Sequence, residues 1–148
     1  MDSFTIKGEN GFIKITIDEV FEFPDRTCHW GGYDVKATAE IKSGNFYVKS
    51  SFYTSTGEIF QLYESLRKCN KILDGTAIYK NYGENIFIIE TYDSSGHAKI
   101  EGSFSEENEL FNKLDYEFNS DQSYINYSIK ELELIASKYG DMNGVKKR

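Results

Sequence analysis

Hydrophobic and polar positions alternate along most of this chain, and that alternation predicts β-strands. The clearest example is residues 33–42, where apolar side chains alternate with charged or polar ones, as in a strand with one face in the core. A shift of the apolar side near Glu19 and Val20 predicts a β-bulge. Gly44 suits the first central position of a two-residue type II′ hairpin turn. Eight strands are expected, over residues 3–7, 12–23, 33–42, 46–54, 76–82, 85–92, 97–104 and 110–118.

In two segments the apolar residues recur instead at the spacing of an α-helix, 3.6 residues per turn. The first is expected to begin at Ser55, because Glu58 three residues later completes a capping-box pattern. The second is expected to begin at Asp121, whose carboxylate can accept hydrogen bonds from the first free backbone N–H groups. Gly140 is expected to end this second helix in the left-handed conformation.

The two predicted helices divide the chain into halves with the same order of elements, four strands and then a helix. The turn sequence at residues 8–10 recurs 75 residues later, at residues 83–85, with matching apolar positions after it. Either an internal duplication or a chance match of turn-forming residues would explain this recurrence. The first half is longer by roughly the length of the loop at residues 24–32, which we interpret as an insertion.

These elements predict an α+β fold: a mostly antiparallel sheet of about eight strands, packed against two amphipathic helices on one face, with a candidate ββββα pseudo-repeat. The length of 148 residues fits one domain, expected over residues 1–141, followed by a flexible basic tail at 142–148. The longest apolar run covers residues 86–89, and the amino terminus has no apolar signal region. We therefore expect a cytoplasmic protein that does not bind membranes.

Acidic residues are concentrated in one part of the chain. The net charge is −7, and residues 101–121 contribute −6 of it, with seven acids against one base, Lys113. Such a surface repels nucleic-acid phosphates and attracts basic partners, although many proteins are acidic for solubility alone. The seven acids are Glu101, Glu106, Glu107, Glu109, Asp115, Glu117 and Asp121.

No catalytic or cofactor-binding pattern is present. The metal-ligand candidates lack the spacing of a zinc site, and Cys69 is expected to fill the core; these candidates are Cys28, His29, Cys69 and His97. Asp115 and Glu117 share one face of a predicted strand, where we expect solvation rather than acid–base chemistry. Trp30 lies in the longest loop, either as a core anchor, which we favour, or as an exposed binding residue. An enzyme, a metal site and a cofactor are therefore not expected.

Several short segments together resemble the WapI family of bacterial immunity proteins. The resemblance covers about residues 20–140, and one departure is that Gly31-Gly32-Tyr33 follows Trp30 where the family has a Trp-Leu pair. The matching segments are Phe23-Pro24-Asp25, the hairpin at Gly44-Asn45-Phe46, the helix near Glu58–Leu66, Gly96 to Gly102, Leu114-Asp115-Tyr116-Glu117-Phe118 and Asp121-Gln122-Ser123-Tyr124.

The resemblance implies a non-enzymatic inhibitor that binds the toxic C-terminal domain of a cognate bacterial toxin. A nuclease domain must be basic to hold its substrate, so an acidic inhibitor would be attracted to it. The alternative is a small cytoplasmic accessory domain that binds another protein or a small ligand. Either would be a monomer or a weak homodimer. The residues expected to contact the toxin are Glu106, Glu107, Glu109, Asp115, Glu117 and Trp30.

Overall fold

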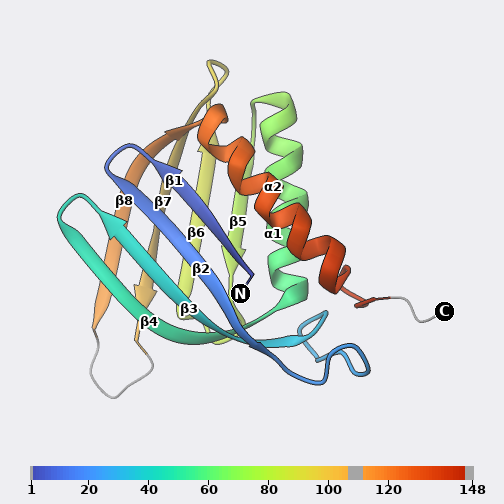
Figure 1. Cartoon of the computed structure of the whole chain (residues 1–148). Coiled ribbons are helices and arrows are strands. Elements are labelled where there is room, and N and C mark those ends of the chain that lie inside the picture. The colour runs from blue at the N-terminus through green and yellow to red at the C-terminus, as the bar shows by residue number, and fades with distance from the viewer. Residues whose placement is uncertain (1, 107–111, 146–148) are drawn as a thin grey trace.

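Eight strands form two antiparallel four-stranded sheets, and each sheet is followed in the chain by one helix (Figure 1). The computed structural model describes residues 2–106 and 112–145. The first sheet and its helix contain β1 (Ser3–Gly8), β2 (Gly11–Val20), β3 (Asp34–Ser43), β4 (Phe46–Ser55) and α1 (Thr56–Ile72). The second sheet and its helix contain β5 (Thr76–Lys80), β6 (Ile86–Tyr92), β7 (His97–Ser105), β8 (Lys113–Asp121) and α2 (Gln122–Tyr139).

The α+β class, the eight strands and the two helices are confirmed, and the repeated order fits a ββββα pattern. The strands are divided between two sheets because α1 carries the chain from the end of β4 to the start of β5. An isolated β-bridge between Glu9 and Asn119 links the two sheets. The two similar turn sequences, at residues 8–10 and 83–85, lie at the β1–β2 and β5–β6 connections.

The inner faces of the two sheets meet in one hydrophobic core. The rings of Phe52 on β4 and Phe104 on β7 contact edge to face, with centroids 6.2 Å apart. Nearby, the hydroxyls of Thr54 and Tyr79 share a hydrogen bond of 2.6 Å. α2 packs against β1, α1 packs against β5, and the helices contact each other (Figure 1). The helices therefore flank a pair of sheets, whereas we expected them to cover one face of a single sheet.

Side chains from α2 and β8 occupy the outer backbone edge of β1. Glu131 accepts a hydrogen bond from the Thr5 N–H at 3.0 Å, and the Ser128 hydroxyl donates to the Thr5 carbonyl at 2.6 Å. The Ser120 hydroxyl donates to the Lys7 carbonyl at 2.6 Å. This edge strand is thus protected from pairing with another chain.

Both predicted helix N-caps are confirmed. The Ser55 hydroxyl accepts a hydrogen bond from the Glu58 N–H at 3.1 Å, and the Asp121 carboxylate accepts one from the Tyr124 N–H at 3.1 Å. Each bond pairs one of the backbone donors that the first turn of a helix leaves free. Local sequence patterns therefore fix where both helices begin.

Replacing Asp121 by Ala should lower the free energy of unfolding by about 1 kcal/mol, because the Tyr124 N–H loses its acceptor. Urea unfolding followed by far-UV circular dichroism measures the change. Asp121→Asn keeps a side-chain oxygen at the same place and should stay close to the unaltered protein. Equal losses in both variants would contradict a capping role.

Two element ends differ from the sequence prediction. β2 ends at Val20 because residues 21–25 form a turn, although the register shift between Ile17 and Glu19 confirms the bulge. Gly140 follows α2, but its φ of 80° and ψ of −159° are not left-handed helical. The chain doubles back there, and a Cβ on Gly140 would lie 2.3 Å from the Gly144 carbonyl oxygen. The expected strand residue Leu110 lies outside the described residues.

The start of the predicted tail contacts the loop before β3. The Gly32 N–H donates to the Met142 carbonyl at 2.7 Å, and the Val145 N–H donates to the Tyr33 hydroxyl at 3.0 Å. The chain is therefore packed against the fold as far as Val145. Residues 146–148, with the three basic side chains, lie outside the described residues.

Candidate functional site

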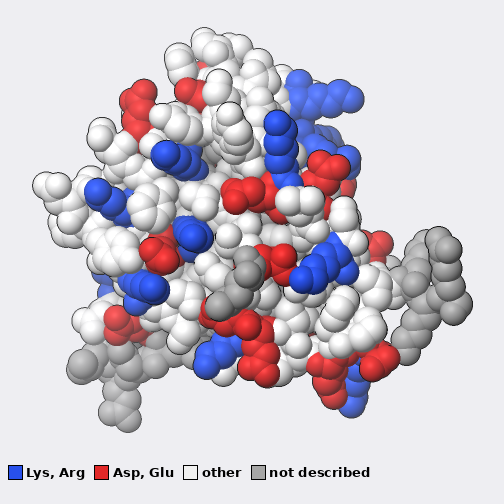
Figure 2. All heavy atoms as spheres, in the orientation of Figure 1, with Lys and Arg blue, Asp and Glu red and all other residues white. Residues whose placement is uncertain are grey.

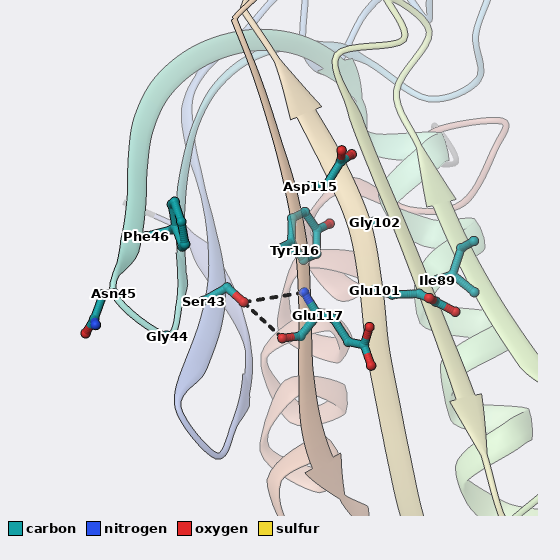
Figure 3. A pocket seen from close by; sticks show the side chains of 10 residues that line it. All are labelled: Ser43, Gly44, Asn45, Phe46, Ile89, Glu101, Gly102, Asp115, Tyr116 and Glu117. Carbon is teal, nitrogen blue, oxygen red and sulfur yellow. Dashed lines mark hydrogen bonds between the residues drawn. The ribbon is translucent and has the colours of Figure 1, made fainter.

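A groove of about 720 Å³ lies between the tip of the β3–β4 hairpin and the second sheet (Figure 3). The Ser43 hydroxyl donates to the Glu117 carbonyl at 3.0 Å and accepts from the Glu117 N–H at 3.4 Å, which holds the hairpin against β8. Gly44 has a φ of 59°, as the predicted type II′ turn requires. The lining residues are Ser43, Gly44, Asn45, Phe46, Ile89, Glu101, Gly102, Asp115, Tyr116 and Glu117.

Three carboxylates face this groove, and two lysines lie near them. Lys99 is 3.2 Å from Glu117 and 3.8 Å from Glu101, and Lys113 is 3.7 Å from Asp115. The hydrogen bond with Glu117, together with the charge of Glu101, raises the pKa of Lys99. All of these side chains are well exposed, so each ion pair contributes little and can be replaced by an incoming cation.

Charges of both signs cover the face of the molecule that Figure 2 shows. On the outer face of the first sheet, Glu40 pairs across the strands with Lys14 and Lys49, and the Lys49 ammonium is 3.9 Å from Glu40. This view shows no large patch of one sign.

The structure brings some of the predicted toxin-binding residues together. Asp115 and Glu117 line the groove, next to Glu101, which the prediction left out. Glu106 lines an adjoining cavity of about 350 Å³ with Val48 and residues of β7 and β8. Glu107 and Glu109 lie outside the described residues.

Trp30 lies at the other end of β4 from the groove. Its ring stacks on Tyr82 with centroids 5.1 Å apart and planes within 2°, and its carbonyl accepts from the Ser55 hydroxyl at 3.5 Å. Phe46 and Ser55 are the two ends of β4, about 30 Å apart at strand spacing. Trp30 is 47% exposed, so the favoured core-anchor prediction was wrong. The loop binds to the Tyr82 ring at the surface rather than entering the core.

An exposed aromatic ring at the groove was missed by the sequence reasoning. Phe46, directly after the hairpin turn, is 69% exposed and lines the groove, whereas the next residue, Tyr47, points to the opposite face and donates to Glu40. Large apolar side chains at the tip of a hairpin are unusual unless they have a partner, and this was the available signal. Phe46 stands across the groove from Asp115 and Glu117 (Figure 3).

Two carboxyl groups with raised pKa values lie away from the groove. Burial raises the pKa of Glu58 to about 7, partly offset by hydrogen bonds from Ser55 and Thr54. Burial raises the pKa of Glu90 to about 8, and neither of its oxygens has a hydrogen-bond partner among the described residues. Glu90 stands 75 residues after Ile15, so the internal match places a carboxyl where the first half has an apolar side chain. A glutamate at the position that matches the apolar Ile15 was the sequence feature that could have identified Glu90 as a buried carboxyl.

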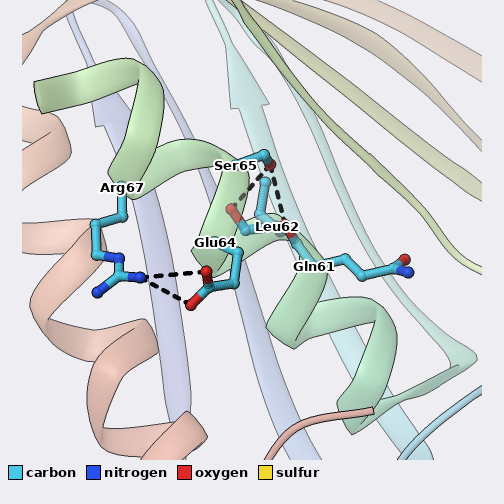
Figure 4. A network of polar contacts seen from close by, with 5 residues as sticks. All are labelled: Gln61, Leu62, Glu64, Ser65 and Arg67. Atoms are coloured by element: carbon cyan, nitrogen blue, oxygen red, sulfur yellow. Dashed lines mark hydrogen bonds and ion pairs between the residues drawn. The ribbon is translucent and has the colours of Figure 1, made fainter. Parts of the chain in front are cut away.

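The outer face of α1 makes contacts within its own helix (Figure 4). Arg67 pairs with Glu64 at 3.0 Å and lies 5.3 Å from the ring centroid of Tyr63. The Ser65 hydroxyl donates to the Gln61 carbonyl at 3.0 Å. These bonds join neighbouring turns and bring in no residue from another element, so they are typical of a solvated helix face.

The described residues contain no group of three or more His, Cys, Asp and Glu side chains that could hold a metal ion. Both cysteines are free, and Cys69 is packed in the core as predicted. None of the described helices is long and apolar enough to cross a membrane. The groove therefore stands out for its exposed carboxylates and aromatic ring, which suit the binding of a partner.

Comparison with known proteins bears on what that partner is. The sequence model of the immunity protein WapI-like family matches residues 4–140, which is most of the chain and includes every strand and helix except the first residue of β1. Comparison with curated proteins gives no match, and comparison with solved structures gives none. The sequence resemblance found over residues 20–140 thus extends to nearly the full fold. The chain belongs to the immunity protein WapI-like family.

Proposed function

We propose that this chain is a cytoplasmic immunity protein that binds the toxic C-terminal domain of a cognate bacterial toxin and neutralises it without catalysis. Family membership supports the general role. The groove with Phe46 opposite Asp115 and Glu117 is the observation that supports a binding site there. Interfaces commonly have aromatic side chains at their centre and a polar rim around them, which fits an exposed ring beside charged groups.

The same groove supports a basic partner. Glu101, Asp115 and Glu117 carry three negative charges, and Lys99 and Lys113 offset two of them with exposed, easily displaced ammonium groups. A partner that presents several arginines or lysines on a rigid surface can replace these two lysines as ion-pair partners of the carboxylates. It supplies more positive charge to the groove than Lys99 and Lys113 do. A nuclease must carry such a surface to hold nucleic-acid phosphates. We therefore propose a basic nuclease domain as the toxin.

Reversing the groove charges tests this proposal. The double variant Asp115→Lys, Glu117→Lys should bind the toxin domain encoded by the neighbouring gene roughly 10- to 100-fold more weakly, mostly through slower association. The salt dependence of binding should also decrease. Surface plasmon resonance at several ionic strengths with an inactivated toxin domain measures both quantities.

A matched control makes the same change in net charge elsewhere. Glu84 lies in the β5–β6 turn and Glu133 on the exposed side of α2, so Glu84→Lys with Glu133→Lys should bind nearly as the unaltered chain does. A third variant reverses Glu106, Glu107 and Glu109 and asks whether the predicted surface extends beyond the groove. Unchanged affinity and salt dependence in the Asp115, Glu117 variant would refute the groove as the binding site.

A further inference from the structure

The outer edge of β4 presents backbone groups that no described residue binds. β3 and β4 join through the two-residue turn at Gly44 and Asn45, so Ser43 and Phe46 form the closing hydrogen-bonded pair. Alternation along an antiparallel ladder then directs the N–H and C=O groups of every second residue away from β3. On β4 these residues are Tyr47, Lys49, Ser51 and Tyr53.

A hydrogen bond to Tyr53 supports this assignment. The Asn81 side-chain amide donates to the Tyr53 carbonyl at 2.8 Å, so that group points away from β3 as the alternation requires. The N–H and C=O groups of Tyr47, Lys49 and Ser51 have no hydrogen-bond partner among the described residues. Three consecutive outward residues offer six backbone groups in the spacing of a strand ladder, which another extended strand can pair all at once.

The other long edges are at least partly occupied. β1 is closed by Ser120, Ser128 and Glu131, as described above. On β8, Ser43 binds the N–H and C=O of Glu117, and the Glu9 N–H binds the Asn119 carbonyl, which leaves the outward groups of Lys113 and Asp115. β5 has five residues. Among the edges, β4 combines ten residues with an outer side that no described residue binds over its central part.

Exposed aromatic side chains are also concentrated on β4. Phe46, Tyr47 and Tyr53 are 69%, 56% and 39% exposed. Phe46 borders the acidic groove, and Val48 borders the adjoining cavity beside Leu114. A strand added to β4 would therefore gain main-chain hydrogen bonds and also place alternate side chains against this groove.

We propose that the toxin domain binds by adding an extended segment to β4, as a fifth strand of the first sheet. This inference rests on the proposed function and specifies how the partner is held. The segment has alternating side chains: those turned toward the groove are basic, to meet Asp115 and Glu117, or apolar, to pack on Phe46. The main-chain bonds supply affinity, and the groove supplies selection among toxins.

Amide hydrogen exchange in the full chain tests the pairing directly. In the free protein the amides of Tyr47, Lys49 and Ser51 should exchange rapidly, whereas Val48 and Ser50, which bond to β3, should be protected and serve as internal controls. Binding of the inactivated toxin domain should slow exchange at the three outward amides about tenfold or more. NMR detection resolves the individual residues.

Proline substitution tests whether the backbone carries the affinity. Lys49→Pro removes an outward N–H and keeps the bonds to β3, a position where an edge strand tolerates proline. It should weaken toxin binding about tenfold or more. Lys49→Ala is the matched control, because it loses the same ion pair with Glu40 but keeps the N–H. A thermal unfolding curve for each variant verifies the fold.

The outcomes separate this inference from the proposed function. A bound toxin domain with unchanged exchange at Tyr47, Lys49 and Ser51, or protection at Lys113 and Asp115 instead, would overturn β4 pairing and leave the immunity function intact. Protection of the β4 amides in the free protein that grows with concentration would show pairing between two copies, and would also overturn it. No binding of the toxin domain at all would overturn both proposals.

Discussion

Glu90→Gln should remove a steep loss of stability that we expect in the unaltered protein as the pH rises. The folded-state pKa of Glu90 is about 8, above its ordinary value of 4.5, so the folded protein holds a proton there that the unfolded chain releases. Below pH 4.5 the carboxyl is protonated in both states, so its titration adds no pH dependence to the free energy of unfolding. Between pH 4.5 and 8 the free energy of unfolding should fall by roughly 3–5 kcal/mol in total, and above pH 8 the loss is complete.

The surroundings of Glu90 explain the direction of this effect. Glu90 is 1% exposed on the inner face of β6, and burial is the main cause of its raised pKa. The Tyr92 hydroxyl lies near Glu90 but donates its proton to Asn70 at 2.8 Å. Tyr92 therefore has an oxygen that can accept from a neutral carboxyl, but no second proton to give to a carboxylate.

Urea unfolding of the two proteins between pH 5 and pH 9 measures the difference. The Glu90→Gln variant should gain stability relative to the unaltered chain as the pH rises, whatever its stability at pH 5. Glu90→Ile, which copies the side chain at Ile15, should show the same relative gain with rising pH, while the contribution of Glu58 remains in all of these proteins. Glu101→Gln, on the exposed face of β7, is the control and should keep the slope. Parallel pH curves for Glu90→Gln and the unaltered protein would contradict the assignment.

Local patterns predicted the elements because each depends on neighbours in the sequence. Alternation located the strands, and the N-caps at Ser55 and Asp121 were found from side chains three residues from their partners. The division into two sheets depends on contacts across the whole chain. Ser43 meets Glu117, and Thr5 meets Glu131, over separations of 74 and 126 residues. A hydrophobic repeat along the chain does not show which distant residues will contact each other.

The candidate site was predictable to the same extent. Alternation placed Asp115 and Glu117 together on an outer face, and they line the groove. The other residues of the groove are brought there by contacts between strands. Lys99 reaches Glu117 because β7 pairs with β8. Phe46 faces Asp115 and Glu117 because Ser43 holds the hairpin against β8. The position of Trp30 was predicted wrongly because a loop has no hydrophobic repeat that separates buried from exposed side chains. Its partner Tyr82 lies 52 positions away, in the β5–β6 turn.

Gly102 is the position where a single added methyl group should be most damaging. A Cβ there would lie 1.8 Å from the Phe87 carbonyl oxygen and 2.6 Å from the Tyr116 hydroxyl. Those two groups are hydrogen-bonded to each other at 2.6 Å, directly over the glycine. Gly102→Ala must push β6 away from β7 and break this bond, which leaves a carbonyl and a largely buried hydroxyl unpaired. We expect a loss of at least about 3 kcal/mol in the free energy of unfolding.

Two further variants separate the causes of this loss. Gly44→Ala has a φ of 59° but nothing within 4 Å of the new methyl group, so it should show the backbone cost alone, about 1–2 kcal/mol. Tyr116→Phe removes the hydrogen bond without adding volume and should cost about 1–2 kcal/mol. Urea unfolding ranks the three, and a loss in Gly102→Ala no larger than that in Tyr116→Phe would refute the steric explanation. Because Gly102 also lines the groove, the close approach of β6 and β7 that this glycine permits also shapes the surface that carries Glu101, Asp115 and Glu117.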